Sequence, residues 1–419
     1  MMDYNTAIEY THSLLRFGSR PGLERIKALL CALGNPQKKL SAVHIAGTNG
    51  KGSVCACLSK IFERKGLKTG LFISPYIVDF RERMQINSKF ISKVDYAEAA
   101  SEVKEAAESL DESLHPTEFE FVTAAALLWF SKMNCDVVVL ETGLGGRLDS
   151  TNIFENPLCT VITSISTDHT AVLGDTIEKI AVEKCGIIKK DCPVVTCDGQ
   201  PPKAMAVIEA TAKNLGAPLK VVKKEDINLL FDTAFGIDLI YKGINIHQPL
   251  AGSFQAENTC LAVEAAKTAF PDISDDVISK GIERVRHPAR FEVMSKSPLI
   301  ILDGAHNDGG AKALSQSLEN YLPGQRLFGI CGMLEDKEYE KALSHLAPLF
   351  DEIITVTPKN SRALAAEELA ECLKGKVKKV YPSAVDSGLV KRAVEAANGR
   401  PIVIFGSLYL AGEIYKYFS

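Results

Sequence analysis

A glycine-rich stretch with one lysine is the clearest candidate for chemistry in this sequence. It follows the alternating apolar run 40–45, precedes a run of helical periodicity, and consists of Gly47, Thr48, Asn49, Gly50, Lys51, Gly52 and Ser53. Glycines let backbone N–H groups approach an anion closely, and the start of a helix adds partial positive charge. Because Lys51 adds a full charge, the stretch is typical of a loop that holds nucleotide phosphates.

The stretch differs from the common phosphate-loop pattern G-x-x-x-x-G-K-[ST] at two positions. Ile45 stands where the first glycine is expected, and Gly52 separates Lys51 from Ser53. An ordinary strand-to-helix turn is therefore the alternative on the local sequence, although the density of glycines favours a nucleotide.

Polar residues also follow three predicted strands. Ser74 follows the run 69–73, Glu141 follows the apolar run 135–140, and His169 follows the run 159–165. Because parallel strands end at one edge of a sheet, these side chains are expected where open α/β folds bind ligands. Beside a nucleotide they suit a divalent cation, with Mg²⁺ preferred. For His169 alone, a capping or core histidine is the alternative.

The elements around these residues predict an α/β protein with two domains. Residues 1–294 predict a P-loop ATPase-like domain with a mostly parallel sheet, and a hairpin over 229–249 is expected to pair at its edge. Residues 295–419 alternate regularly and predict a smaller Rossmann-like, doubly wound domain, with a helix over 383–397. This domain lacks G-x-G-x-x-G, so its fold alone does not indicate a dinucleotide.

Composition narrows the class of partners. The net charge of −4 argues against nucleic acid, which usually binds to a basic domain. The 11 cysteines are odd in number and contain no C-x-x-C pair, which indicates reduced cysteines rather than a zinc site or disulfides. No apolar run approaches the ~20 residues that span a bilayer. We expect a cytoplasmic protein that acts on small molecules without a membrane partner.

Taken together, the motifs resemble those of the folylpolyglutamate and dihydrofolate synthases, the folate members of the Mur ligase superfamily. The phosphate stretch matches the family's GTNGKGS, and matching blocks continue in order over nearly the whole chain. These blocks are Ser74-Pro75, 117–120, 141–149, Asp168-His169, 183–186, 303–307 and Gly406-Ser407. One departure is His287-Pro288-Ala289-Arg290, where the family usually has Trp-Pro-Gly-Arg.

The resemblance implies an ATP-dependent ligase that adds L-glutamate to the γ-carboxylate of a folate through an acyl phosphate, or to dihydropteroate. It also implies two Mg²⁺ ions, admits a monovalent cation, and is compatible with a monomer. The implied ATP contacts are the phosphate stretch, Asn258, Arg290 and Asp303. The implied metal ligands are Ser74, Glu141, His169 and, if carbamylated, Lys184. The implied catalytic residues are Lys51, Lys184, His306 and Ser407. The implied folate or pterin contacts are Thr117, Glu118, Phe119, Glu120, Asp149 and Asn152.

Three other functions compete with this interpretation. A cell-wall amino-acid ligase of the Mur type shares the fold, but Gly52 after Lys51 favours the folate branch. A P-loop NTPase switch or kinase does not explain the second α/β domain. A non-catalytic nucleotide-binding scaffold would not need its catalytic-type residues to be intact, and these are Lys51, Glu141, His169 and His306. The sequence does not decide between folate and dihydropteroate as the acid substrate.

Overall fold

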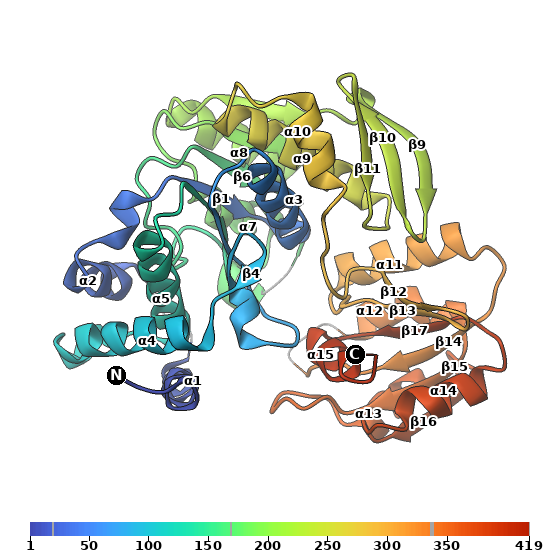
Figure 1. Ribbon diagram of the computed structural model, residues 1–419. Coiled ribbons are helices and arrows are strands. Elements are labelled where there is room, and N and C mark those ends of the chain that lie inside the picture. Colours follow the sequence, from blue (N-terminus) through green and yellow to red (C-terminus); the bar gives the residue numbers. More distant parts are fainter. Residues whose placement is uncertain (19–20, 168–169, 336–338, 419) are drawn as a thin grey trace.

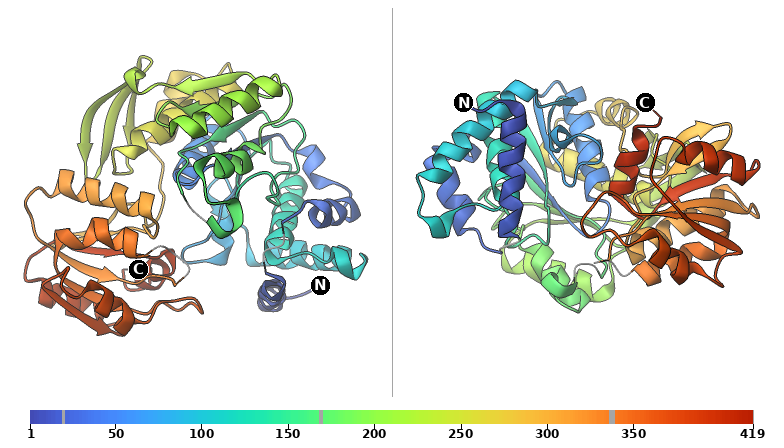
Figure 2. Two further views of the ribbon diagram at one scale, coloured as in Figure 1. Left: turned by 180° about the vertical axis from the view of Figure 1, so that it is seen from behind. Right: turned by 90° about the horizontal axis from the view of Figure 1, so that it is seen from below.

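The computed structural model describes residues 1–18, 21–167, 170–335 and 339–418. Figure 1 shows two α/β lobes, with a small antiparallel sheet of β9, β10 and β11 projecting over the C-terminal lobe. The two further views in Figure 2 show the lobes side by side. The described helices include none that is long and apolar enough to cross a membrane.

The N-terminal lobe is built on an eight-stranded sheet with the order β4-β3-β2-β5-β1-β6-β7-β8. β3 and β4 run antiparallel at one edge, and the other strands are parallel. Every residue of the central strands β1 and β5 is buried, as expected for parallel strands with both faces covered. The strands are β1 Ala42–Ala46, β2 Thr69–Phe72, β3 Met84–Ile86, β4 Lys89–Phe90, β5 Val137–Glu141, β6 Cys159–Ile162, β7 Val194–Cys197 and β8 Leu219–Val222.

Helices cover both faces of this sheet, and their apolar side chains form its cores. One face packs against α3 (Lys51–Arg64), α9 (Phe254–Ala269) and α10 (Asp275–Ile282). The other face carries the remaining helices of the lobe, apart from the short α6 (Thr170–Leu173). These are α1 Tyr4–Ser13, α2 Glu24–Ala32, α4 Lys93–Glu108, α5 Glu118–Lys132, α7 Ile177–Cys185 and α8 Pro202–Asn214. The predicted mostly parallel sheet around the glycine-rich loop is confirmed.

The predicted pairing of the hairpin at the edge of the main sheet is wrong. The turn at 241–243 does join β10 (Gly236–Tyr241) to β11 (Ile244–Gln248), but β9 (Ile227–Thr233) pairs on the other side of β10. The three strands form a separate antiparallel sheet. The reason is burial, because the alternate residues Ile237, Leu239 and Tyr241 of β10 pack into the core beside α9.

The C-terminal lobe is a six-stranded sheet with the order β12-β13-β17-β14-β15-β16. All its neighbouring pairs are parallel except β12 with β13. Helices α11, α12 and α13 pack on one face, and α14 and α15 on the other, which confirms the doubly wound prediction. The elements are β12 Glu292–Lys296, β13 Leu299–Leu302, α11 Asp308–Tyr321, β14 Leu327–Cys331, α12 Tyr339–Leu346, β15 Phe350–Val356, α13 Ala366–Leu373, β16 Lys379–Ser383, α14 Leu389–Ala397, β17 Ile402–Phe405 and α15 Leu408–Tyr415.

Two boundaries of the C-terminal lobe differ in detail from the prediction. The helix predicted over 383–397 begins only at Leu389, because the residues before it form the partly exposed edge strand β16 and a turn. β12 spans the predicted boundary between residues 294 and 295, and it pairs with β13. We therefore propose that the domain boundary lies in the connector between α10 and β12, residues 283–291.

A buried histidine in β1 gives a testable pH dependence of stability. His44 is 1% exposed, and its Nε2 lies 2.8 Å from Thr151 Oγ1. Burial, aided by the charge of Lys189, lowers the pKa of His44 from 6.5 to about 3. Between these values the unfolded chain binds a proton that the folded chain does not. The free energy of unfolding should therefore fall as the pH falls below 6.5, by at most about 1.4 kcal/mol per pH unit.

We expect urea unfolding to show a larger loss of stability between pH 7 and pH 5 for the native protein than for His44→Gln. The glutamine keeps a polar group near Thr151 but does not titrate in this range. Equal pH dependence of the two proteins would contradict a neutral buried His44.

Candidate active site

The glycine-rich loop connects β1 to α3 and is closely approached from two sides. A Cβ atom at Gly47 would overlap Thr163 Oγ1, and one at Gly50 would overlap Asn258 Oδ1 of α9. Gly50 also has a φ of +89°, in the left-handed region that favours glycine. The loop therefore needs glycine at these positions. Asn258, which the family resemblance implies as an ATP contact, lies beside the loop.

Two lysines place positive charge on the loop. Lys51 Nζ donates to the carbonyl oxygens of Gly47 (3.0 Å) and Thr48 (3.2 Å). Lys184, in α7, is 3% exposed, and its Nζ donates to the same Gly47 carbonyl at 2.8 Å. The start of α3 adds the partial charge of its backbone N–H groups. Such an arrangement of positive charge is suited to a phosphate chain.

A carboxylate and a hydroxyl-bearing residue lie next to the loop. Glu141 ends β5, and its Oε2 accepts a hydrogen bond of 3.2 Å from the backbone N–H of Ser74. Burial raises the pKa of Glu141, and the charge of Lys51 offsets part of that shift. A Cβ atom at Gly52 would lie 3.8 Å from the same Oε2. Ser53, in the first turn of α3, is 4% exposed.

These oxygen donors fit Mg²⁺, which binds through one or two protein oxygens while phosphates and waters fill the rest of its shell. The third predicted ligand, His169, lies outside the described residues. Within the described ranges, no group of three or more His, Cys, Asp or Glu side chains could hold a metal.

The C-terminal lobe presents three of the predicted residues at one edge of its sheet. Asp303 and His306 follow β13, and Ser407 follows the neighbouring parallel strand β17. Asp303 accepts hydrogen bonds of 2.7 Å from the N–H groups of Phe291 and Ala305. Its carboxylate thus fixes the connector between the lobes.

The other two predicted residues of this lobe make local contacts. His306 Nδ1 lies 2.8 Å from the carbonyl oxygen of Gly304. Ser407 caps α15, with its Oγ accepting from the N–H of Tyr409 at 3.0 Å. These contacts orient His306 and Ser407 at the edge where open α/β sheets bind ligands.

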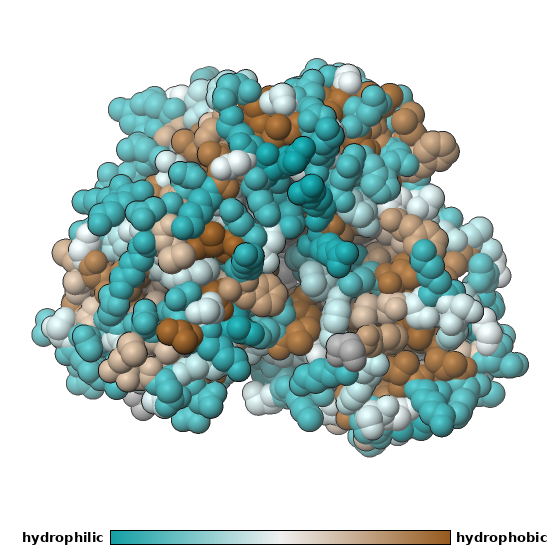
Figure 3. Space-filling view, in the orientation of Figure 1, coloured by the Kyte–Doolittle hydropathy of each residue, from teal (hydrophilic) through white to brown (hydrophobic). Residues whose placement is uncertain are grey.

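The C-terminal lobe reaches the glycine-rich loop directly. A Cβ atom at Gly309, in the first turn of α11, would lie 2.8 Å from Asn49 Nδ2 and 3.3 Å from Ser166 Oγ. Burial raises the pKa of Asp303 and of Glu141, and the charge of Arg290 in the connector offsets part of both shifts. Arg290 therefore acts on carboxylates of both lobes. In the space-filling view a hollow separates the lobes on the face shown (Figure 3).

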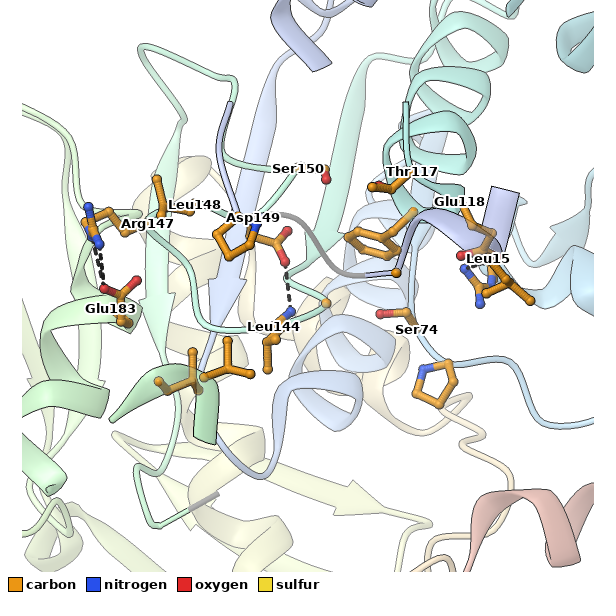
Figure 4. A pocket seen from close by; sticks show the side chains of 18 residues that line it. Leu15, Ser74, Thr117, Glu118, Leu144, Arg147, Leu148, Asp149, Ser150 and Glu183 are labelled. Atoms are coloured by element: carbon orange, nitrogen blue, oxygen red, sulfur yellow. Dashed lines mark hydrogen bonds and ion pairs between the residues drawn. The ribbon is translucent and has the colours of Figure 1, made fainter. Parts of the chain in front are cut away.

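A cavity of about 560 Å³ opens beside this site. Of the residues predicted to bind the acid substrate, Thr117, Glu118, Phe119 and Asp149 line it. Ser74 also lines the cavity and faces the loop between β5 and β6 (Figure 4). Within that loop, Asp149 Oδ2 accepts a hydrogen bond of 2.8 Å from the N–H of Leu144.

Two of the predicted substrate contacts do not line the cavity. Glu120 Oε2 accepts from the N–H of Thr117 (2.8 Å) and pairs with Arg25 (3.1 Å), so it fixes the start of α5. Asn152 Nδ2 donates to the carbonyl oxygens of Arg147 and Gly186, both at 3.0 Å. Both residues thus stabilise the segments that form the cavity wall without lining the cavity themselves.

Arg83 has no role in the sequence-based prediction, but the structure places it in the cavity wall. Its guanidinium lies 5.3 Å from the ring centre of Tyr76 and 5.5 Å from that of Phe80. It pairs with Glu118 at 3.5 Å, yet its buried Nε and Nη1 have no hydrogen-bond partner in the described part of the chain. The sequence signal was only a polar segment after β2, which does not reveal burial.

Comparison with known proteins agrees with this geometry. The model of the Mur ligase middle domain matches residues 45–266, and that of the Mur ligase, glutamate ligase domain matches residues 289–408. The dihydrofolate synthase/folylpolyglutamate synthase of Bacillus subtilis is 36% identical over 430 aligned positions, covering 99% of this chain and 98% of that protein.

Solved structures give the same result. Folylpolyglutamate synthase of Mycobacterium tuberculosis, in complexes with ADP and AMPPCP, superposes with a TM-score of 0.90 at 32% identity, covering 100% of this chain and 99% of that one. Escherichia coli FolC in complex with DHPP and ADP gives a TM-score of 0.86 at 28% identity, with 99% and 98% covered.

A parallel-sheet domain with a glycine-rich phosphate loop, joined to a Rossmann-like domain, defines an ATP-dependent ligase of the Mur type. Within that class the chain belongs to the family of folylpolyglutamate and dihydrofolate synthases.

Proposed function

We propose that this protein uses Mg-ATP to join L-glutamate to the γ-carboxylate of a reduced folate, and that it also converts dihydropteroate to dihydrofolate. The observation that carries the proposal is that the cavity and the phosphate loop meet at one point. Ser74 lines the cavity, its N–H donates to Glu141, and Glu141 adjoins Gly52 of the loop. A carboxylate held in the cavity can therefore face the terminal phosphate of ATP.

The proposed chemistry solves a leaving-group problem. A carboxylate does not acylate an amine, because its leaving group would be oxide. When a carboxylate oxygen attacks the γ-phosphorus of ATP, ADP leaves and an acyl phosphate forms. The amine of glutamate then attacks the acyl carbon, loses a proton, and displaces phosphate. Phosphoryl transfer needs mainly positioning and charge neutralisation, which the loop, Lys51 and the start of α3 supply.

Ser74 and Glu141 would hold Mg²⁺, which when bound neutralises phosphate charge and orients the γ-phosphate. Lys184 would add a ligand for a second Mg²⁺ if its amine were carbamylated, while as an ammonium group it holds the loop through Gly47. Asn258, Arg290 and Asp303 would contact the nucleotide. His306 and Ser407 would face the incoming glutamate from the C-terminal lobe. Since both lobes of one chain supply the site, we propose that the protein acts as a monomer. We also propose that it works in the cytoplasm.

The test is phosphate release from Mg-ATP and L-glutamate with either dihydropteroate or a reduced monoglutamyl folate, with products identified by mass. Turnover with both acids supports the proposal in full. Turnover with the folate alone would restrict the protein to polyglutamate synthesis. Turnover with neither acid would contradict the proposal and favour a cell-wall type substrate.

Arg83 gives a prediction about the acid substrate. We expect Arg83→Ala to raise the KM for the acid at least about tenfold, because one hydrogen bond to a charged group contributes about 1.5–3 kcal/mol. The KM for ATP should change much less, because Arg83 lines only the cavity. Arg81→Ala is a matched control, since Arg81 pairs with Asp79 and does not line the cavity. An unchanged KM for the acid would remove Arg83 from the binding site.

A further inference from the structure

The connector between the lobes places one imidazole against the phosphate loop. His287 Nε2 lies 2.6 Å, and its Cε1 2.9 Å, from the position that a Cβ atom at Gly52 would occupy. Glu141 Oε2 lies 3.8 Å from the same point. Because Gly52 is in the first turn of α3, the imidazole lies beside the start of this helix. This is where a phosphate chain would be held.

The ring nitrogen that faces the loop is buried and unpaired. His287 Nε2 has no hydrogen-bond partner among the residues that the structure describes. Native proteins pair nearly all such groups with a protein, water or ligand atom, so a buried nitrogen at a binding site indicates an absent partner. Burial, together with the charge of Arg290, lowers the pKa of His287 to about 3, so the ring is neutral and carries one N–H.

We propose that His287 binds the phosphates of ATP by donating an Nε2–H hydrogen bond to a phosphate oxygen, an inference that depends on the nucleotide site proposed above. A phosphate suits this nitrogen, because a neutral imidazole N–H donates a hydrogen bond that a phosphate oxygen can accept. The surroundings also favour an anion, since the ring lies against Gly52 in the first turn of α3, where the helix N-terminus carries partial positive charge.

The position of His287 in the connector links nucleotide binding to the second lobe. Two residues further on, the carbonyl oxygen of Ala289 accepts from the N–H of Gly304 at 2.8 Å, and Phe291 donates to Asp303 at 2.7 Å. The connector is thus fixed to the C-terminal sheet at the end of β13. A phosphate bound by His287 would therefore be in contact with the connector that leads to the C-terminal lobe.

The proposal is tested by direct binding of ATP and of adenosine, which lacks phosphates, to the folded full-length protein by calorimetry. His287→Phe keeps an aromatic ring without N–H, and His287→Gln places an amide N–H at similar reach, whereas the shorter His287→Asn does not. We expect the Phe and Asn variants to bind ATP about tenfold more weakly, with unchanged affinity for adenosine and partial recovery in the Gln variant. His247→Phe is the matched control, because His247 is exposed and pairs with Asp238 in the small sheet.

Native ATP affinity in both the Phe and Asn variants would overturn the proposal, and so would an equal loss for ATP and adenosine. If the Phe variant does not fold, as judged by its thermal transition, the comparison of the Asn and Gln variants decides in the same way. Lys51→Ala is measured in parallel. If Lys51→Ala also leaves ATP affinity unchanged, the nucleotide site itself is misplaced, whereas a loss in Lys51→Ala alone rejects only the role of His287.

Discussion

Replacing Lys51 by alanine is expected to lower turnover by about two orders of magnitude or more. Lys51 supplies one of the two positive charges at the loop where we propose that the γ-phosphate is transferred, and it is held in place by the carbonyl oxygens of Gly47 and Thr48. A preorganised charge that meets developing negative charge contributes on the order of 10²–10³ in rate. The measurement is kcat for phosphate release at saturating Mg-ATP, folate and glutamate.

Lys60→Ala is the control for this change, since Lys60 lies in the same helix, α3, and pairs with Glu63 away from the loop. Both variants must keep the thermal transition of the native protein. Near-native turnover in a folded Lys51→Ala protein would exclude Lys51 from the catalytic site.

Replacing Glu141 by glutamine should change how turnover depends on Mg²⁺. Glu141 is a buried carboxylate beside the loop, and burial raises its pKa. A bound cation would offset that cost, and an uncharged amide would bind Mg²⁺ more weakly. We expect the Mg²⁺ concentration for half-maximal turnover to rise at least about tenfold, the scale on which metal sites respond to lost partners.

Glu155→Gln provides the matched control, because it removes an exposed carboxylate between β5 and β6. A Mg²⁺ titration of Glu141→Gln that matches the native curve would remove Glu141 from the metal site.

The parts of the fold that local rules govern could be predicted from the sequence. The run of four apolar residues before Glu141 gave a fully buried strand, and the regular alternation after residue 295 gave the doubly wound lobe. The small sheet could not be predicted in this way, because the pairing of β10 depends on β9 and on burial against a distant helix. Strand β16 carried a weak signal, since most of its side chains are at least partly exposed.

The residues of the candidate site also divide into those that local rules could place and those that depend on contacts between distant segments. Ser74, Glu141 and Asp303 could be placed because parallel strands end at one edge of a sheet. A motif match does not say whether a side chain faces the cavity, and Glu120 and Asn152 stabilise its walls instead. Arg83 and His287 could not be found by local patterns. Arg83 meets Glu118, and His287 meets Gly52, only in the folded chain, because these segments lie far apart in the sequence.

The measurement that most directly tests the central claim follows an oxygen atom of the acid substrate. The folate is labelled with ¹⁸O in its γ-carboxylate, and the products of one turnover with Mg-ATP and L-glutamate are analysed by mass. If the cavity presents the carboxylate to the γ-phosphate held by the loop, one ¹⁸O atom appears in inorganic phosphate and the other in the new amide. Label in AMP, or no label in phosphate, would contradict the account.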